Sequence, residues 1–195
     1  MSNERRDPAL VLAEEIGWLR ALDHPELLAS PVAEALQALE HTHPDLADQA
    51  RVCAIDPSLS DTDALNEHFR LDPDATGNCV LVAGKRAGER RVAACVVRAS
   101  DFADVNHVVK KLLDVHKASF LPMEQAVELS GMEYGGITPV GLPTSWRLLV
   151  DAQVAARQTV LIGSGVRASK LLVPGALLAA LETAEVIQGL GIAPR

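Results

Sequence analysis

The chain has 195 residues, of which 48% are hydrophobic and 3% aromatic, and a formal net charge of −8. This length is enough for one well-buried core, and no run approaches the ~18 apolar residues of a membrane span. The scarcity of aromatic residues argues against a single-strand binding surface built from stacked rings. Residues 1–74 carry 16 acidic and 5 basic side chains, whereas residues 75–195 carry 10 and 13. The second part therefore has the positive charge that local contact with a phosphate needs.

The first part of the chain predicts helices and one strand. Apolar residues at helical spacing predict a helix over residues 7–24, with Pro8 in its first turn. Ser30 as N-cap and Pro31 at the first helical position predict a second helix over residues 30–39. A strand is expected at 50–56 and a capped helix at 60–69.

The remainder alternates strands and helices. Apolar strands at 78–84 and 91–99, joined by the polar turn "KRAGER", predict a hairpin. Further helices are expected at 101–114, at 122–131 and at the start of 175–190, and further strands at 116–121, 147–151, 158–163 and 169–174. The predicted fold is a single mixed α/β domain with a curved or barrel-like mixed sheet flanked by helices, because the interleaved hairpins exclude a simple doubly wound sheet.

Several familiar motifs are excluded by their context. "GSGVRA" (163–168) has the form of a dinucleotide fingerprint, but the extended "SKLLVP" follows where that fingerprint must open a helix. The sequence has no phosphate-loop spacing and no G-x-S-x-G elbow. The only histidines at ligand spacing are His41 and His43, in a predicted surface loop. We therefore expect neither a metal nor a cofactor.

The N-terminus and the cysteines indicate the compartment. The first ten residues contain no hydrophobic signal core. Cys53, Cys79 and Cys95 form no C-x-x-C pair, and an odd number leaves one unpaired. These features predict reduced thiols in a cytoplasmic protein.

The stretch "GMEYGGITPVGLP", residues 131–143, concentrates four glycines and two prolines. It resembles the glycine-rich signature of the YbaK and prolyl-tRNA-synthetase-associated domain family, a group of trans-acting aminoacyl-tRNA editing deacylases. The likeness includes the central hairpin "CVLVAG…RRVAACVVRAS", the segment "DVNHVVKKLLDVHKASFLPMEQAVELSG" and the closing hairpin "TVLIGSGVRASKLLVP". It covers residues 50–190 and begins more weakly near residue 30.

The resemblance implies a small pocket that receives the aminoacyl group at the 3′ end of a tRNA. Glycine lets backbone N–H groups approach a ligand, and each such donor can stabilise an oxyanion by about 10²–10³ in rate. The pocket would suit a small side chain such as alanine, serine or cysteine. The implied catalytic residues are Asn78, Gly135 and Gly136, and the implied substrate-binding residues are Ile137, Thr138, Pro139, Gly163, Ser164, Gly165, Arg167 and Lys170.

One position departs from the family pattern. The family's characteristic lysine, at the start of the first hairpin strand, corresponds to Asn78. A neutral amide in place of a charge weakens a contact by about 1–2 kcal/mol. Lys117, Arg167 and Lys170 are the cations that could replace it, and Arg167 is the first choice because it follows the glycine-rich turn at 163–165.

Two functions of different classes follow. The first is a free-standing hydrolase that removes a wrong small amino acid from tRNA, acting on the acceptor end, with a synthetase as a further partner. The alternative is a catalytically degenerate module that senses an amino acid, a nucleotide or an aminoacyl-tRNA. Residues 1–29 are predicted to form a helical extension and residues 30–195 the editing-like domain.

Overall fold

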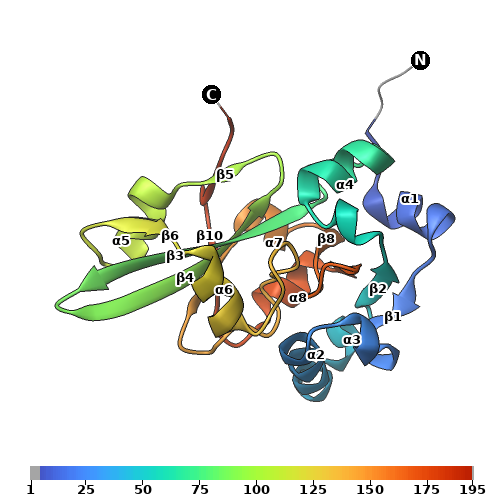
Figure 1. Cartoon of the computed structure of the whole chain (residues 1–195), viewed down its shortest axis with the longest axis horizontal. Coiled ribbons are helices and arrows are strands. Elements are labelled where there is room, and N and C mark those ends of the chain that lie inside the picture. The colour runs from blue at the N-terminus through green and yellow to red at the C-terminus, as the bar shows by residue number, and fades with distance from the viewer. Residues whose placement is uncertain (1–4, 195) are drawn as a thin grey trace.

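A long β-hairpin organises the computed structural model, which describes residues 5–194 (Figure 1). Strand β3 (Gly77–Arg86) pairs with β4 (Glu89–Arg98) in antiparallel register along its whole length. The hairpin lies within a five-stranded sheet of order β10-β7-β4-β3-β6, in which β10, β7 and β4 are parallel neighbours and β6 is antiparallel to β3. The other strands of this sheet are β6 (Ala118–Phe120), β7 (Arg147–Asp151) and β10 (Ala184–Ile187).

A second, antiparallel sheet has the order β1-β2-β9-β8. Its strands are β1 (Leu19–Arg20), β2 (Arg51–Ala54), β8 (Val160–Gly163) and β9 (Ser169–Val173). A single parallel bridge between Thr76 and Leu161 joins it to the first sheet, just before β3. Gly77 makes this close approach possible, because a Cβ there would lie 3.1 Å from Val160 and from Ile162. Strands β5 (Phe102–Ala103) and β11 (Gly191–Ile192) form a separate pair.

Short helices cover the sheets. They are α1 (Pro8–Glu15), α2 (Ser30–Thr42), α3 (Pro44–Ala47), α4 (Thr62–Phe69), α5 (Lys110–Leu112), α6 (Met123–Ser130), α7 (Ala152–Ala155) and α8 (Gly175–Ala179). Tighter or wider helical turns occur at Ala21–Asp23, Pro25–Leu27, Pro57–Leu59 and Val105–Val109. No helix among residues 5–194 is both long enough and apolar enough to cross a membrane.

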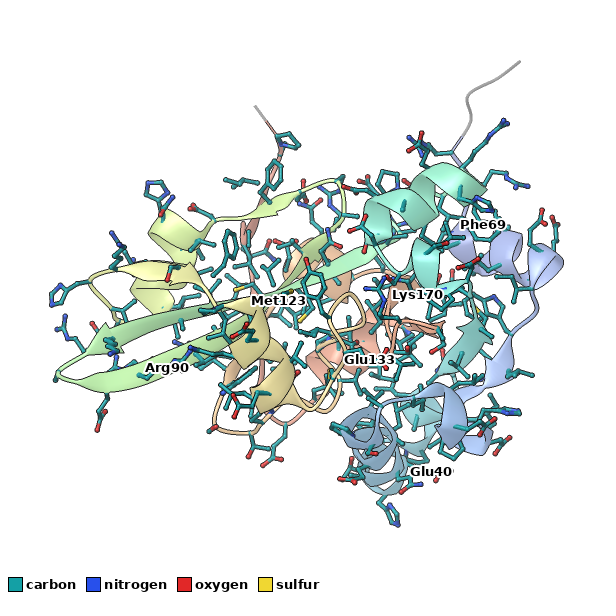
Figure 2. The ribbon with its side chains drawn as sticks, viewed as in Figure 1. Glu40, Phe69, Arg90, Met123, Glu133 and Lys170 are labelled. Atoms are coloured by element: carbon teal, nitrogen blue, oxygen red, sulfur yellow. The ribbon has the colours of Figure 1, made fainter. Side chains whose placement is uncertain are left out.

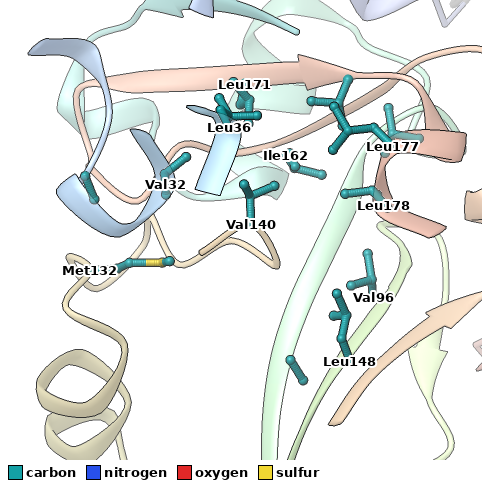
Figure 3. Packing of buried hydrophobic residues seen from close by; sticks show 14 of the residues in the cluster. Val32, Leu36, Val96, Met132, Val140, Leu148, Ile162, Leu171, Leu177 and Leu178 are labelled. Carbon is teal, nitrogen blue, oxygen red and sulfur yellow. The ribbon is translucent and has the colours of Figure 1, made fainter. Parts of the chain in front are cut away.

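Three clusters of apolar side chains form the core. The largest packs the two sheets against α2 and α8, and Figure 3 shows its members Leu36, Ile162, Leu171, Leu177 and Val96 among others. A second cluster packs the segment from Val105 to Val115 against the other face of the five-stranded sheet. A third packs α1 and α4 against the four-stranded sheet.

The predicted mixed α/β fold is confirmed, and the sheets do not close into a barrel. The helix predicted over residues 7–24 is wrong beyond Glu15, because Gly17 adopts φ +92° and the chain then extends to pair β1 with β2. The helix predicted over 101–114 begins only at Val105, since Phe102 and Ala103 pair with β11.

The predicted N-terminal extension falls partly outside the described residues, which begin at Arg5. Its described part contributes β1 to the four-stranded sheet. The division at residue 29 stays a prediction.

Candidate active site

A cavity of about 550 Å³ opens where the two sheets meet. Its walls come from the start of β3, the end of β8, β9, the loop after α6 and the segment leading into α4. The structure brings six of the eleven predicted site residues to it: Asn78, Gly135, Ile137, Gly163, Arg167 and Lys170. These residues are separated by up to 92 positions in the chain, so the cavity is a product of the tertiary fold.

The glycine-rich loop offers backbone donors to this cavity. Gly135 has φ +84°, a conformation that favours glycine. The N–H of Gly135 and that of Ile137 have no acceptor within residues 5–194, and both residues line the cavity. The Gly136 N–H instead donates to the Glu133 carbonyl at 2.9 Å. Of these three loop N–H groups, those of Gly135 and Ile137 have no partner among the described residues, whereas that of Gly136 is used within the loop.

Gly136 serves packing. A Cβ at this position would lie 2.6 Å from the backbone carbonyl carbon of Val166, so no larger residue fits without moving the loop. Its carbonyl accepts from the Gly165 N–H at 2.8 Å. At Gly163 a Cβ would collide with the Gly136 carbonyl oxygen. The glycines therefore let two loops press together beneath the cavity.

Four other predicted binding residues do not line the cavity. Ser164 is buried, with its hydroxyl oxygen 2.7 Å from that of Ser169. Gly165 packs against Ala29, and Thr138 is fully buried with no hydrogen-bond partner for its hydroxyl among the described residues. Pro139 lines a second cavity of about 510 Å³ between α2 and residues 180–183, which follow α8. These residues shape the loops that carry the site.

Lys170 is the buried cation of the cavity (Figure 2). Lys170 is only 4% exposed, and its Nζ donates to the Ser60 carbonyl at 2.7 Å. Burial lowers the pKa of its ammonium group from 10.5 to about 8, although the nearby Asp61 carboxylate acts in the opposite direction. Strand β9 thus places an ammonium group in a cavity where the start of β3 supplies only the neutral Asn78.

Arg167 ties the glycine-rich loop to the segment before α4. Its guanidinium donates to the carbonyls of Tyr134 and Pro57, both at 3.1 Å. A Cβ added to Gly135 would lie 2.9 Å from Nη1 of Arg167. The third candidate cation, Lys117, lies near the far end of the hairpin and lines a different groove. Of the two cations in the cavity, Lys170 is the more buried.

The cavity lining contains no hydroxyl or thiol paired with a histidine base. Cys79 lines the cavity, but burial raises the pKa of its thiol far above the usual value, so the thiol stays protonated at neutral pH. The only carboxylate in the lining is Asp61, which caps α4 by accepting from the N–H groups of Asp63 and Ala64. The lining contains no histidine, and residues 5–194 hold no cluster of three or more His, Cys, Asp or Glu suited to a metal.

Sequence reasoning missed the wall formed by the segment before α4. Ser58, Ser60, Asp61 and Thr62 line the cavity. The capped helix at 60–69 was predicted, but nothing local indicates which loop its N-terminus faces. The same segment covers Lys170, so the sequence does not indicate that this side chain is buried either.

Comparison with known proteins agrees with this architecture. The family model of the aminoacyl-tRNA editing domain matches residues 56–181, and the chain therefore belongs to that family. The matched span contains the whole cavity lining.

Solved structures with the same fold extend the comparison. One is a proposed trans-editing enzyme for prolyl-tRNA synthetase, with a TM-score of 0.64 and 19% identity over 82% of this chain and 96% of that one. Another is a hypothetical protein with a TM-score of 0.66 and 21% identity over 79% of this chain and 99% of that one. A search among curated proteins found no match.

Proposed function

We propose that this protein hydrolyses the ester bond between a mischarged small amino acid and the 3′ end of a tRNA. The observation that carries the proposal is the cavity itself, which is lined by a buried ammonium group and by two residues whose backbone N–H groups have no partner among residues 5–194. This cavity lies in a chain that belongs to the aminoacyl-tRNA editing family. A solved protein of the same fold is described as a trans-editing enzyme, which supports the same reaction class.

The two N–H groups suit the charge that develops when water attacks an ester. The carbonyl oxygen becomes an oxyanion, and fixed donors in a site that excludes water stabilise it without reorganising. Gly135 and Ile137 supply such donors from one loop. An aminoacyl ester is already reactive, so the protein needs no strong nucleophile of its own.

Lys170 supplies the positive charge that Asn78 lacks. An ammonium group in a poorly solvated cavity acts on nearby negative charge more strongly than one in water. Among residues 5–194 its single hydrogen-bond partner is the Ser60 carbonyl, which leaves two of its three N–H donors for substrate. Asn78, half-buried and in the same lining, would orient the substrate through its amide.

The cavity volume indicates what part of the RNA enters. About 550 Å³ falls within the range of small-ligand sites, and it would hold the terminal nucleoside with its amino acid. Gly77, Gly135 and Gly163 leave room for a small amino-acid side chain. Action on tRNA and the three free cysteines fit the predicted cytoplasmic location.

A panel of mischarged tRNAs tests the proposal, beginning with alanine, serine and cysteine. The expected result is cleavage by the wild type of at least one of them, with a loss of 10²-fold or more in Lys170→Met. Inertness of the wild type on the whole panel would refute the hydrolase. An inert wild type that becomes active as Asn78→Lys would instead identify a binding module that retains the pocket, because Asn78 is the position that departs from the family pattern.

A further inference from the structure

The far end of the β3–β4 hairpin carries a dense group of positive charges. We call this region the basic end: residues 85–91 of the hairpin and residues 110–117, which pack against it. Its cations are Lys85, Arg86, Arg90, Arg91, Lys110, Lys111 and Lys117, and the carboxylates within or beside it are Glu89, Asp114 and Glu124. The excess of positive charge is opposite in sign to the net charge of −8 of the whole protein.

Few of these cations are neutralised by the protein. Asp114 pairs with Arg91 at 3.0 Å and approaches Arg86 at 3.7 Å. Arg90 donates to the neutral Gln125 amide at 2.6 Å, and no ion pair among the described residues involves Lys85 or Lys117. The unpaired charges face solvent, because both lysines and Arg90 are exposed.

The register of the hairpin places like charges against each other. Lys85 lies directly opposite Arg90 on the neighbouring strand. Like charges in this position destabilise a hairpin, so local folding does not account for them. A polyanion bound at this end would remove that repulsion.

The surface is also hollowed. A groove of about 730 Å³ is lined by Lys85, Arg90, His116 and Lys117, together with Phe120, whose residue is 64% exposed. The cations suit the phosphate backbone of RNA, and the exposed ring gives the groove an apolar wall. An acidic protein would satisfy the charges equally well, so the choice between the two partners rests on where the basic end lies relative to the cavity.

The distance from the cavity defines which part of the RNA would be contacted. Strand β3 runs from Asn78 in the cavity to Arg86 at the basic end, and at about 3.3 Å per residue the two are about 26 Å apart. Figure 2 shows Arg90 in the left part and Lys170 in the right half of the view. A molecule whose acylated end occupies the cavity would reach the basic end only with its body.

We propose that the basic end binds the phosphate backbone of a base-paired RNA stem whose 3′ end occupies the cavity. This inference rests on the proposed function and adds to it a second contact, remote from the ester. The basic end would set how tightly the RNA is held and leave the chemical step unchanged.

The test compares two double variants that remove the same charge. Lys85→Gln/Lys117→Gln alters the basic end, and Arg6→Gln/Arg70→Gln alters the opposite end of the molecule, near α1 and α4 (Figure 1). The probe is an unacylated RNA hairpin with a single-stranded 3′ end, titrated by fluorescence anisotropy at several KCl concentrations.

The basic-end variant is expected to reduce the slope of log K against log salt by about 2. At 0.1 M salt this corresponds to a loss of affinity of up to about 60-fold. The control variant should match the wild type. On the acylated hairpin, the basic-end variant should raise KM and keep kcat.

The outcomes separate this inference from the proposed function. A wild type that cleaves the ester, with a basic-end variant equal to it in slope and KM, overturns the inference alone. A wild type that binds the hairpin with the expected slope but cleaves nothing overturns the hydrolase and supports the surface. Displacement of the RNA by poly-glutamate, with binding of that polymer lost in the same variant, would assign the surface to an acidic protein and overturn the RNA contact.

Discussion

Lys170→Met tests how much free energy the folded protein loses by burying the Lys170 ammonium group. Holding a lysine whose pKa is lowered from 10.5 to about 8 costs about 3 kcal/mol at pH values below 8. Methionine removes that cost while filling similar space. It also removes the hydrogen bond to the Ser60 carbonyl, and a hydrogen bond to a charged group contributes about 1.5–3 kcal/mol. The two effects nearly cancel at pH 7, so we expect the two proteins to unfold with similar free energies there.

The sign of the pH dependence follows from proton linkage. Between pH 8 and 10.5 the unfolded chain binds more protons at Lys170 than the folded chain does, so the stability of the wild type rises with pH across this window. The methionine variant lacks this contribution. Between pH 7 and pH 10 the free energy of unfolding of the wild type should therefore rise by about 2–3 kcal/mol relative to that of Lys170→Met.

Urea unfolding of both proteins at half-unit pH intervals measures this difference. Titrating groups remote from Lys170 contribute equally to both proteins and cancel. A difference that stays constant from pH 7 to pH 10 would refute the reasoning, because it would mean that the ammonium group is solvated and the cavity offers no poorly hydrated site for charge.

Two further predictions concern catalysis. Gly135→Ala should reduce hydrolysis by about 10²–10³-fold, because the added Cβ would lie 2.9 Å from Nη1 of Arg167 and displace the Gly135 N–H. The control is Gly17→Ala, at the similar φ of +92° but with no neighbour within 4 Å. It should retain full hydrolysis in the same tRNA assay. An equal loss in both variants would mean that backbone strain alone is responsible. The enzymatic rate, divided by the uncatalysed rate at each pH, should fall about tenfold per unit above pH 8 as Lys170 loses its proton. A rise through pH 8 would show that Lys170 acts as a base.

Local signals predicted those elements whose ends are set by nearby residues. The capped helix predicted at 60–69 is α4, with Asp61 as its cap, and the helix predicted at 122–131 is α6, which ends at Gly131 in the left-handed conformation. The hairpin was predicted from two apolar strands and a short turn. By contrast, Leu19 has helical spacing from Leu12 but lies in β1, because pairing with β2 decides its conformation. Strand β2 lies more than thirty residues away in the chain, so no pattern near Leu19 predicts this pairing.

The candidate site likewise has parts that the sequence predicts and parts that depend on distant contacts. The glycine-rich loop is visible in the sequence, but which glycines face a ligand depends on what lies behind them. Val166 lies behind Gly136 and Ala29 behind Gly165, so both of these glycines serve packing. Lys170 follows a serine and precedes three apolar residues, a pattern that does not distinguish a buried lysine from an exposed one. Only the contact with Ser60, 110 positions earlier, establishes its burial.

The positions of Asn78 and Lys170 allow a test of whether the positive charge of the cavity can come from β3 instead of β9. Both residues line one cavity, but they come from different sheets. If hydrolysis requires only a cation in the cavity, Asn78→Lys should restore the activity that Lys170→Met loses, to within about tenfold of the wild type. Asn78→Lys alone should lower stability below pH 8, because two ammonium groups would then share one poorly solvated space.

The double variant is compared with each single variant in deacylation and in urea unfolding. Restored activity would mean that a cation on either β3 or β9 can serve the reaction. A double variant that folds but cleaves no faster than Lys170→Met would refute this exchange. It would then tie the function of Lys170 to its own position, where its Nζ donates to the Ser60 carbonyl.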